Sequence, residues 1–216
     1  DSLRLKYCVR VNNGSGIIVV PETNDYLYVF TNYHVIENIP QQQIFISFDK
    51  NSDCFGKTLP IKTFHFCKED DTAIIVVDRF DDLESLYICQ NRDECIHELI
   101  HIGHPSARYK VPKSDPDSVS NVLILQHITS DGFISNKNNL IEYGYQYPPR
   151  KEEIEGMSGG AILTSHYQLV GIHKQSSNID NRELLGKADY IPINCYESLL
   201  LENGLSPIAT PYYDFL

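Results

Sequence analysis

The chain has 216 residues, of which 42% are hydrophobic and 22% charged, a balance that is ordinary for a folded globular protein. Its formal net charge of −11 repels phosphate backbones, so we expect no nucleic-acid partner. No apolar run is long enough to span a bilayer, so we expect no membrane partner, and we expect no secretory segment because no such apolar stretch stands near residue 1. Because the chain begins at Asp1 rather than at Met, we expect it to be processed or cut from something longer.

Short runs of β-branched and aromatic residues recur along the chain between turn residues. They predict strands within 15–20, 25–35, 43–48, 71–77, 120–128, 140–147, 159–166 and 167–174. Many short strands separated by turn signals are typical of an all-β barrel or sandwich. The polar, charged stretch 79–95 is suited to bridge two halves, and residues 192–204 predict a C-terminal helix that ends at Asn203-Gly204.

Six cysteines are spread along the chain without a C-x-x-C pair. A chain of this length does not need disulfides to hold a core. We therefore expect reduced thiols and a cytoplasmic location.

A literal H-E-x-x-H spans residues 97–101, the pattern with which many metalloproteases hold zinc on a helix. Gly103 and Pro105 follow almost at once and would truncate such a helix. The segment is better interpreted as a β-strand at the start of a second β-barrel. We expect no catalytic metal and no cofactor.

The segment Glu155-Gly156-Met157-Ser158-Gly159-Gly160 places a serine among three glycines before an apolar strand. A serine nucleophile needs backbone N–H groups directed at the oxyanion and a bare backbone that a substrate can approach. This pattern predicts Ser158 as the nucleophile and the N–H groups of Gly156 and Ser158 as the oxyanion hole. The alternative is a simple glycine turn before a strand.

Two further segments carry the residue types that activate a serine. His34 follows a predicted strand, although a lone histidine is usually structural. Asp71 stands at the mouth of another strand, where a carboxylate can accept a histidine Nδ1–H and stabilise the imidazolium. Asp70, one residue earlier, is the alternative acid.

The order His34, Asp71, Ser158 is that of chymotrypsin-like proteases and differs from that of subtilisins and α/β-hydrolases. The stretches "NGSGIIV", "FTNYHVIEN", "DDTAIIVV", "HIGHPS", "LVGIHK" and "ADYIPINCYESLL" strengthen the likeness along nearly the whole chain. The sequence resembles the trypsin-like (chymotrypsin-fold) serine peptidases. It is similar to the bacterial branch that includes the high-temperature-requirement proteases and glutamyl endopeptidases.

This resemblance implies an all-β fold of two six-stranded antiparallel β-barrels with a C-terminal helix. Residues 1–90 would form the barrel that carries His34 and Asp71, and residues 91–216 the barrel that carries Ser158. The implied activity is a serine endopeptidase that acts on protein or peptide substrates.

The chain departs from the digestive trypsins at two points. Met157 stands where those enzymes carry the aspartate that pairs with a new N-terminus, and no cysteine lies near His34 or Ser158. Both departures fit a bacterial or intracellular enzyme. We expect its activity to be restrained by a fused domain or a partner protein.

The resemblance also indicates where the substrate binds. The peptide is expected to add as a strand beside residues 171–174, that is Gly171, Ile172, His173 and Lys174. Glu152 lies six residues before the nucleophile, where trypsins place the acid that selects Lys or Arg at P1, the residue before the scissile bond; Glu155 adds a second acid. His173 instead resembles the pocket histidine of glutamyl- and glutamine-selective enzymes. The two interpretations predict opposite charge preferences, and the acidic cluster favours a basic P1.

Two other functions remain as alternatives. A trypsin-like scaffold could bind peptides or assemble with partners without catalysis. A zinc peptidase would need the H-E-x-x-H to act with a third ligand.

Overall fold

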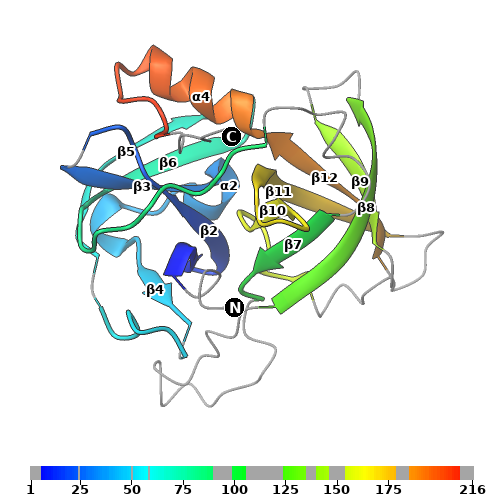
Figure 1. The fold of residues 1–216 in the computed structure, drawn as a ribbon, viewed down its shortest axis with the longest axis horizontal. Coiled ribbons are helices and arrows are strands. Elements are labelled where there is room, and N and C mark those ends of the chain that lie inside the picture. The colour runs from blue at the N-terminus through cyan, green and yellow to red at the C-terminus, as the bar shows by residue number, and fades with distance from the viewer. Residues whose placement is uncertain are drawn as a thin grey trace, which may run out of the picture.

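The computed structural model describes residues 6–23, 25–49, 51–57, 59–89, 99–105, 124–134, 140–145, 154–178 and 185–209. Within these ranges the chain forms two antiparallel β bodies side by side, one from each half of the sequence (Figure 1). The division predicted at residue 90 falls outside the described ranges and stays a prediction.

The first body is a curved sheet of six strands among the described residues, in the order β4-β1-β2-β3-β6-β5. Its strands are β1 (Cys8–Val11), β2 (Gly14–Val19), β3 (Tyr26–Asn32), β4 (Ile46–Phe48), β5 (Ile61–Cys67) and β6 (Thr72–Asp78). The described residues of β4 and β5 do not pair with each other. The short helix η1 (Gln41–Gln43) spans this gap, because the Gln41 amide donates to the carbonyls of Ile61 and Lys62 on β5 at 3.2 and 3.3 Å.

The second body closes into a barrel in the order β10-β11-β12-β9-β8-β7. Its strands are β7 (Leu99–Gly103), β8 (Ile124–Ile134), β9 (Ile141–Tyr145), β10 (Ala161–Thr164), β11 (Leu169–Asn178) and β12 (Leu185–Pro192). Pairing of β7 with β10, from Ala161↔Ile102 to Thr164↔Leu99, completes the ring. The H-E-x-x-H segment therefore continues into an extended strand from Leu99 onward, as the glycine and proline after it predict.

Strands β2, β3 and β6 are buried on both faces over most of their length, which explains why their apolar residues appear in the sequence as continuous runs rather than alternating ones. One face of each turns to the interior of the first body. The other face of β2 and β3 contacts the second body through β7 and β11, and β6 contacts the C-terminal helix. The two bodies thus share one hydrophobic core, and a smaller apolar cluster fills the second barrel.

The helix α4 (Ile193–Glu202) follows β12 directly and lies across the top of the view in Figure 1. It returns from the second body to pack on β5 and β6 of the first. Tyr196 stacks on Phe30 with ring centroids 4.7 Å apart and donates its hydroxyl hydrogen to the Thr31 carbonyl at 2.6 Å. This helix therefore supports the end of β3, from which the candidate catalytic histidine emerges.

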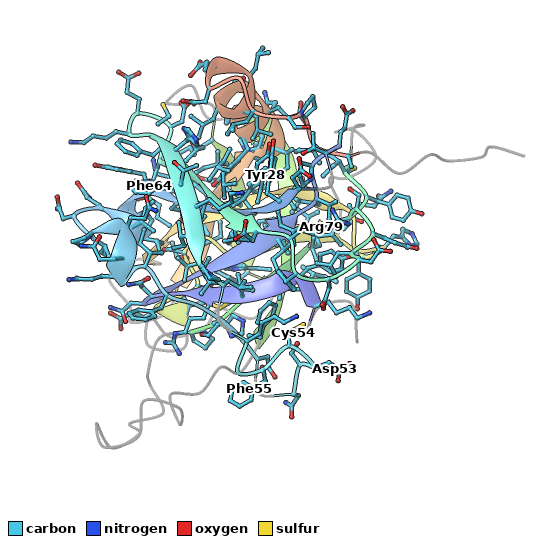
Figure 2. The ribbon with its side chains drawn as sticks, turned by 90° about the vertical axis from the view of Figure 1, so that its left-hand side faces the viewer. Tyr28, Asp53, Cys54, Phe55, Phe64 and Arg79 are labelled. Atoms are coloured by element: carbon cyan, nitrogen blue, oxygen red, sulfur yellow. The ribbon has the colours of Figure 1, made fainter. Side chains whose placement is uncertain are left out.

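The turns after β4 lie at the lower edge of the first body, where Figure 2 shows Asp53, Cys54 and Phe55. Cys54 is buried and Phe55 is half exposed. Cys8, Cys54, Cys67 and Cys195 are not in a disulfide, but Cys89 is disulfide-bonded. The prediction of reduced cysteines is wrong at that position, because residue spacing alone does not reveal which thiols the fold brings together.

The fold class predicted from the sequence is confirmed: two antiparallel β bodies with a C-terminal helix, as in a chymotrypsin-like double β-barrel. Strands β1 and β5 were not predicted, and β12 was indicated only by the family resemblance of "ADYIPINCYESLL". Among the helices that the structure describes, none has the length and apolar character needed to cross a membrane.

Candidate active site

The candidate histidine comes from the junction between a strand and a single helical turn. His34 is the second residue of α2 (Tyr33–Ile36), which begins as soon as β3 ends at Asn32. Two contacts hold this turn against the start of β6: Tyr33 N–H donates to the Asp71 carbonyl at 3.1 Å, and the Asn32 amide donates to the same oxygen at 3.4 Å. The backbone around His34 is therefore fixed by the segment that carries its acidic partner.

Asp71 binds His34 through both carboxylate oxygens. Oδ1 accepts the backbone N–H of His34 at 2.9 Å, and Oδ2 lies 2.6 Å from the ring Nδ1. The carboxylate can only accept, so Nδ1 carries a hydrogen, and in the neutral ring the lone pair is on Nε2. The side chain of Asp71 is 9% exposed and that of His34 is 43% exposed, which leaves the Nε2 side of the ring accessible. The geometry selects Asp71 over the alternative acid Asp70.

Asp71 reaches this position through an uncommon backbone conformation. Its φ of 56° lies in the left-handed region, which aspartate tolerates better than most residues. Its N–H donates to the Lys68 carbonyl at 3.2 Å and closes the turn between β5 and β6. The turn thus aims the carboxylate back toward α2.

Ser158 lies in a tight turn just before β10. Met157 N–H donates to the Ile154 carbonyl and Gly160 N–H to the Met157 carbonyl, both at 2.9 Å. Gly156 and Gly159 adopt φ values of 95° and 87°, which favour glycine. A β-carbon on Gly159 would also lie 2.0 Å from a backbone oxygen of β2. The glycines of the motif are therefore required by the turn and by its close approach to the first body.

Hydrogen bonds from both bodies hold this turn in place. Ser15 N–H on β2 donates to the Ser158 carbonyl at 2.8 Å, and Gly159 N–H donates to the His173 carbonyl on β11 at 3.1 Å. The buried Ser15 hydroxyl also donates to the Gly156 carbonyl at 2.9 Å. Sequence reasoning did not assign a role to Ser15, although it stands inside the "NGSGIIV" stretch that carries the family likeness.

The two predicted oxyanion donors are available. Within the described residues, the N–H groups of Gly156 and Ser158 are not used by any hydrogen bond. Both residues line the cleft together with His34 and Asp71. This arrangement leaves two backbone donors beside the serine hydroxyl, as an oxyanion site requires.

The Ser158 hydroxyl donates to the Lys174 carbonyl at 3.2 Å. In the described part of the chain it makes no hydrogen bond to His34. Both side chains nevertheless line one cleft of about 750 Å³ between the two bodies. The lining residues are Tyr33, His34, Glu37, Lys68, Asp71, Ile154, Glu155, Gly156, Ser158, His173, Lys174, Gln175 and Ser176.

Only some of the predicted substrate-binding residues line the cleft in the structure. His173, Lys174 and the exposed Glu155 line the cleft, whereas Glu152 lies outside the described residues. Gly171 and Ile172 are buried and paired on both sides, with β10 and with β12. They do not present an edge to a substrate.

The edge of β11 that faces the cleft begins after His173. The N–H and carbonyl of His173 are bound by the turn that carries Ser158, at 2.9 and 3.1 Å. A register shift follows between His173 and Gln175, and Lys174, Gln175 and Ser176 line the cleft. A peptide strand would therefore pair with Lys174, Gln175 and Ser176, rather than with residues 171–174 as the sequence predicted.

His173 belongs to a buried polar group inside the second barrel. Its Nδ1 lies 2.5 Å from the Tyr143 hydroxyl, and its Nε2 lies 3.4 Å from the Ser176 hydroxyl. Burial lowers the pKa of His173 well below its ordinary value, and the nearby His101 and His34 lower it further. His173 is therefore neutral at pH 7. Tyr143 and Ser176 have no counterpart among the sequence-predicted residues.

The H-E-x-x-H motif does not form a metal site in the part that can be described. His97 and Glu98 lie outside the described residues, and His101 is fully buried on β7. The ring nitrogens of His101 face the Met157 carbonyl at 3.3 Å and the Tyr143 hydroxyl at 3.4 Å. Across the described ranges, no three His, Cys, Asp or Glu side chains gather closely enough to hold a metal.

The chain forms two antiparallel β bodies. The cleft between them holds a histidine–aspartate pair and a serine on a glycine turn. These features place the chain in the chymotrypsin-like double β-barrel class. Comparison with family models matches residues 14–172 to the trypsin-like peptidase domain. The chain belongs to that family. A search of curated proteins finds no match to it.

Proposed function

We propose that the chain is a serine endopeptidase in which His34, Asp71 and Ser158 hydrolyse peptide bonds through an acyl-enzyme. The observation that carries this proposal is the doubly bound His34–Asp71 pair in the cleft that also contains Ser158. Asp71 fixes the tautomer that leaves His34 Nε2 as a base. A serine in one cleft with such a base and with free backbone donors is the set of groups that acyl transfer needs.

The reaction follows from these groups. His34 Nε2 takes the proton of Ser158 Oγ as that oxygen attacks the scissile carbonyl, and the N–H groups of Gly156 and Ser158 stabilise the oxyanion. His34 then gives the proton to the leaving amine. Water attacks the acyl-enzyme with the same base, and Ser158 is regenerated.

Substrate binding would free the serine hydroxyl for this step. In the resting site the Lys174 carbonyl accepts the Ser158 hydroxyl hydrogen. A peptide added as a strand along β11 would place a backbone N–H on the same carbonyl. That N–H would compete with the hydroxyl for the carbonyl oxygen, and a rotation about the Ser158 Cα–Cβ bond to another staggered position would turn the hydroxyl toward His34.

We also propose that P1 is glutamine rather than a basic residue. The cleft wall beyond Ser158 carries the neutral imidazole of His173 and the Ser176 hydroxyl, 3.4 Å apart. A carboxamide can donate to and accept from such groups without a charge, whereas Lys, Arg or Glu would lack a charged partner there. Glu155 is exposed at the cleft, so it offers a basic side chain only a solvated, weak attraction.

A peptide library varied at P1 tests the pocket. We expect cleavage after glutamine to exceed cleavage after glutamate, lysine and arginine at least tenfold in kcat/KM. His173→Leu should remove that preference. Strong cleavage after lysine or arginine would restore the acidic-pocket interpretation centred on Glu152.

The activity itself is tested with a fluorophosphonate probe, which reacts with activated serines. We expect the protein to be labelled at Ser158, and expect Ser158→Ala and His34→Ala to abolish labelling. Mass spectrometry of the labelled peptide identifies the site. If the folded protein is not labelled and cleaves no peptide in the library, the endopeptidase proposal is wrong.

A peptide-binding scaffold without catalysis is the second candidate function. The observation that favours it is the Ser158 hydroxyl, which is bound to Lys174 rather than to His34. The same experiment separates the two. Peptide binding measured by calorimetry, without labelling of Ser158, would support the scaffold.

We also propose a finer classification of the chain within its family. The likeness of "NGSGIIV" and "FTNYHVIEN" to the bacterial branch supports a bacterial type related to high-temperature-requirement proteases or glutamyl endopeptidases. Four cysteines that are not in a disulfide support a cytoplasmic location, and the disulfide at Cys89 weighs against it. We further propose control by a fused domain or partner protein, because a free cytosolic protease would attack its surroundings. The redox state of Cys89 in intact cells, measured by thiol labelling, tests the location.

A further inference from the structure

The acyl-transfer mechanism does not use a row of buried and half-buried polar groups that crosses the second barrel. The row borders the substrate cleft at Ser176 and His173 and ends at the turn that carries Ser158. Its members, in order, are the side chains of Tyr145, Ser176, His173, Tyr143 and His101, and the Met157 carbonyl. The hydrogen-bond distances between successive members are 2.7, 3.4, 2.5, 3.4 and 3.3 Å.

The direction of the hydrogen bonds is fixed from the Met157 end. A carbonyl can only accept, so the Nε2 of His101 that faces it carries a hydrogen. Burial lowers the pKa of His101 to about 4, so the ring is neutral at pH 7 and carries no second hydrogen. Nδ1 is then an acceptor, and the Tyr143 hydroxyl, 3.4 Å away, donates to it.

The rest of the row follows from this assignment. Tyr143 has one hydroxyl hydrogen, so its oxygen accepts from His173 Nδ1–H at 2.5 Å. The neutral His173 then accepts at Nε2 from the Ser176 hydroxyl, which accepts in turn from Tyr145. Each group in the row donates its hydrogen toward the Met157 carbonyl. The tautomers of His101 and His173 are determined by the groups on either side of each ring.

The end of the row controls one of the two oxyanion donors. The Met157 carbonyl and the Ser158 N–H belong to the same trans peptide and point in opposite directions. The carbonyl is directed into the buried interior by His101 Nε2–H and by Gly160 N–H, the latter at 2.9 Å. The Ser158 N–H is therefore turned toward the cleft.

This restraint matters because the turn is built from residues with little conformational preference. Glycines stand on both sides, at Gly156 and Gly159, and both occupy the left-handed region. Met157 is fully buried but has no charged side chain that could anchor the turn. A rotated peptide plane would withdraw the Ser158 N–H from the oxyanion.

We propose that His101 is a positioning residue for catalysis, which holds the Met157–Ser158 peptide so that the Ser158 N–H faces the oxyanion, and that Tyr143 fixes the tautomer of His101 that can do so. This inference rests on the proposed endopeptidase function. It assigns a task to the histidine that ends the H-E-x-x-H motif.

The test uses an acylglycine ester as substrate, because glycine at P1 does not engage the pocket around His173. Wild type, His101→Leu and His101→Gln are compared for kcat and KM. We expect His101→Leu to lower kcat about 10- to 100-fold, somewhat less than the loss of a whole oxyanion donor, with KM within about twofold. His101→Gln should recover kcat to within about threefold, since its amide can donate to Met157 and accept from Tyr143.

His104→Leu is the matched control. His104 is also fully buried, three residues beyond His101, and within the described part of the chain its ring makes no hydrogen bond to the turn that carries Ser158. Its replacement should leave kcat within about twofold of wild type. An equal loss of kcat in the His101→Leu and His104→Leu variants would show a general packing effect and overturn the proposal.

Tyr143→Phe gives an independent measurement if His101→Leu does not fold. It keeps the ring but removes the hydroxyl that fixes the His101 tautomer, so kcat on the acylglycine ester should fall about 3- to 10-fold. Wild-type kcat in Tyr143→Phe or in folded His101→Leu would overturn the proposal. A wild-type protein that neither hydrolyses the ester nor reacts with fluorophosphonate would instead refute the endopeptidase function on which it rests.

Discussion

Replacing Asp71 with asparagine separates the charge and the hydrogen-bonding roles of this residue. In the structure its two oxygens accept two hydrogens, one from the His34 backbone at 2.9 Å and one from the ring Nδ1 at 2.6 Å. Asparagine offers one oxygen and one NH₂ group. The fixed backbone N–H takes the oxygen, which leaves the NH₂ facing the ring.

An amide donor at that position forces Nδ1 to accept and moves the ring hydrogen to Nε2. His34 can then no longer take the Ser158 proton. We expect Asp71→Asn to lower kcat by about four orders of magnitude, or about 5 kcal/mol of transition-state stabilisation, with little change in KM. The fold should persist because the replacement is isosteric.

The assay follows initial rates of peptide hydrolysis and, in parallel, the rate of fluorophosphonate labelling. Asp70→Asn is the matched control, because it removes a carboxylate from the same turn without touching His34, and it should leave kcat nearly unchanged. Retention of more than a tenth of kcat by folded Asp71→Asn, or an equal loss in Asp70→Asn, would refute this account of the pair.

Three further predictions concern stability. Gly159→Ala should cost on the order of 1–3 kcal/mol and abolish activity, because the added β-carbon would lie 2.0 Å from the Ser15 carbonyl at a φ of 87°; urea unfolding measures it. Tyr196→Phe removes the hydrogen bond to the Thr31 carbonyl and should cost about 1 kcal/mol, and a Tm equal to that of wild type would contradict it. Burial lowers the pKa of His104 to about 4, so between pH 6.5 and pH 4 the unfolded chain binds a proton that the folded chain does not, and stability falls as the pH falls. The contribution is about 2 kcal/mol between pH 7 and pH 5, and the His104→Leu variant should lose that much less stability than wild type over this range.

Local features of the sequence determined the fold class and the candidate triad. The buried strands β2, β3 and β6 are continuous apolar runs, and the glycines around Ser158 mark a turn that the backbone conformation requires. Strand β1 was missed because it is short and contains Arg10. Strand β5 was missed because polar residues such as Lys62 and His65 interrupt it. Weak local signals of this kind form strands only when neighbouring strands supply their hydrogen bonds.

The tertiary structure alone decided which groups meet inside the second barrel. His101 and His173 stack on each other and both bind the Tyr143 hydroxyl, although they lie 42 and 30 residues from it along the chain. Register around the closed barrel sets these contacts, and a shift of one residue would turn each side chain to the other face. The same holds for the free edge at Lys174 and for the acceptor of the Ser158 hydroxyl. Residue type and order thus determined which chemistry is possible, whereas strand pairing determined where each proton and each lone pair points.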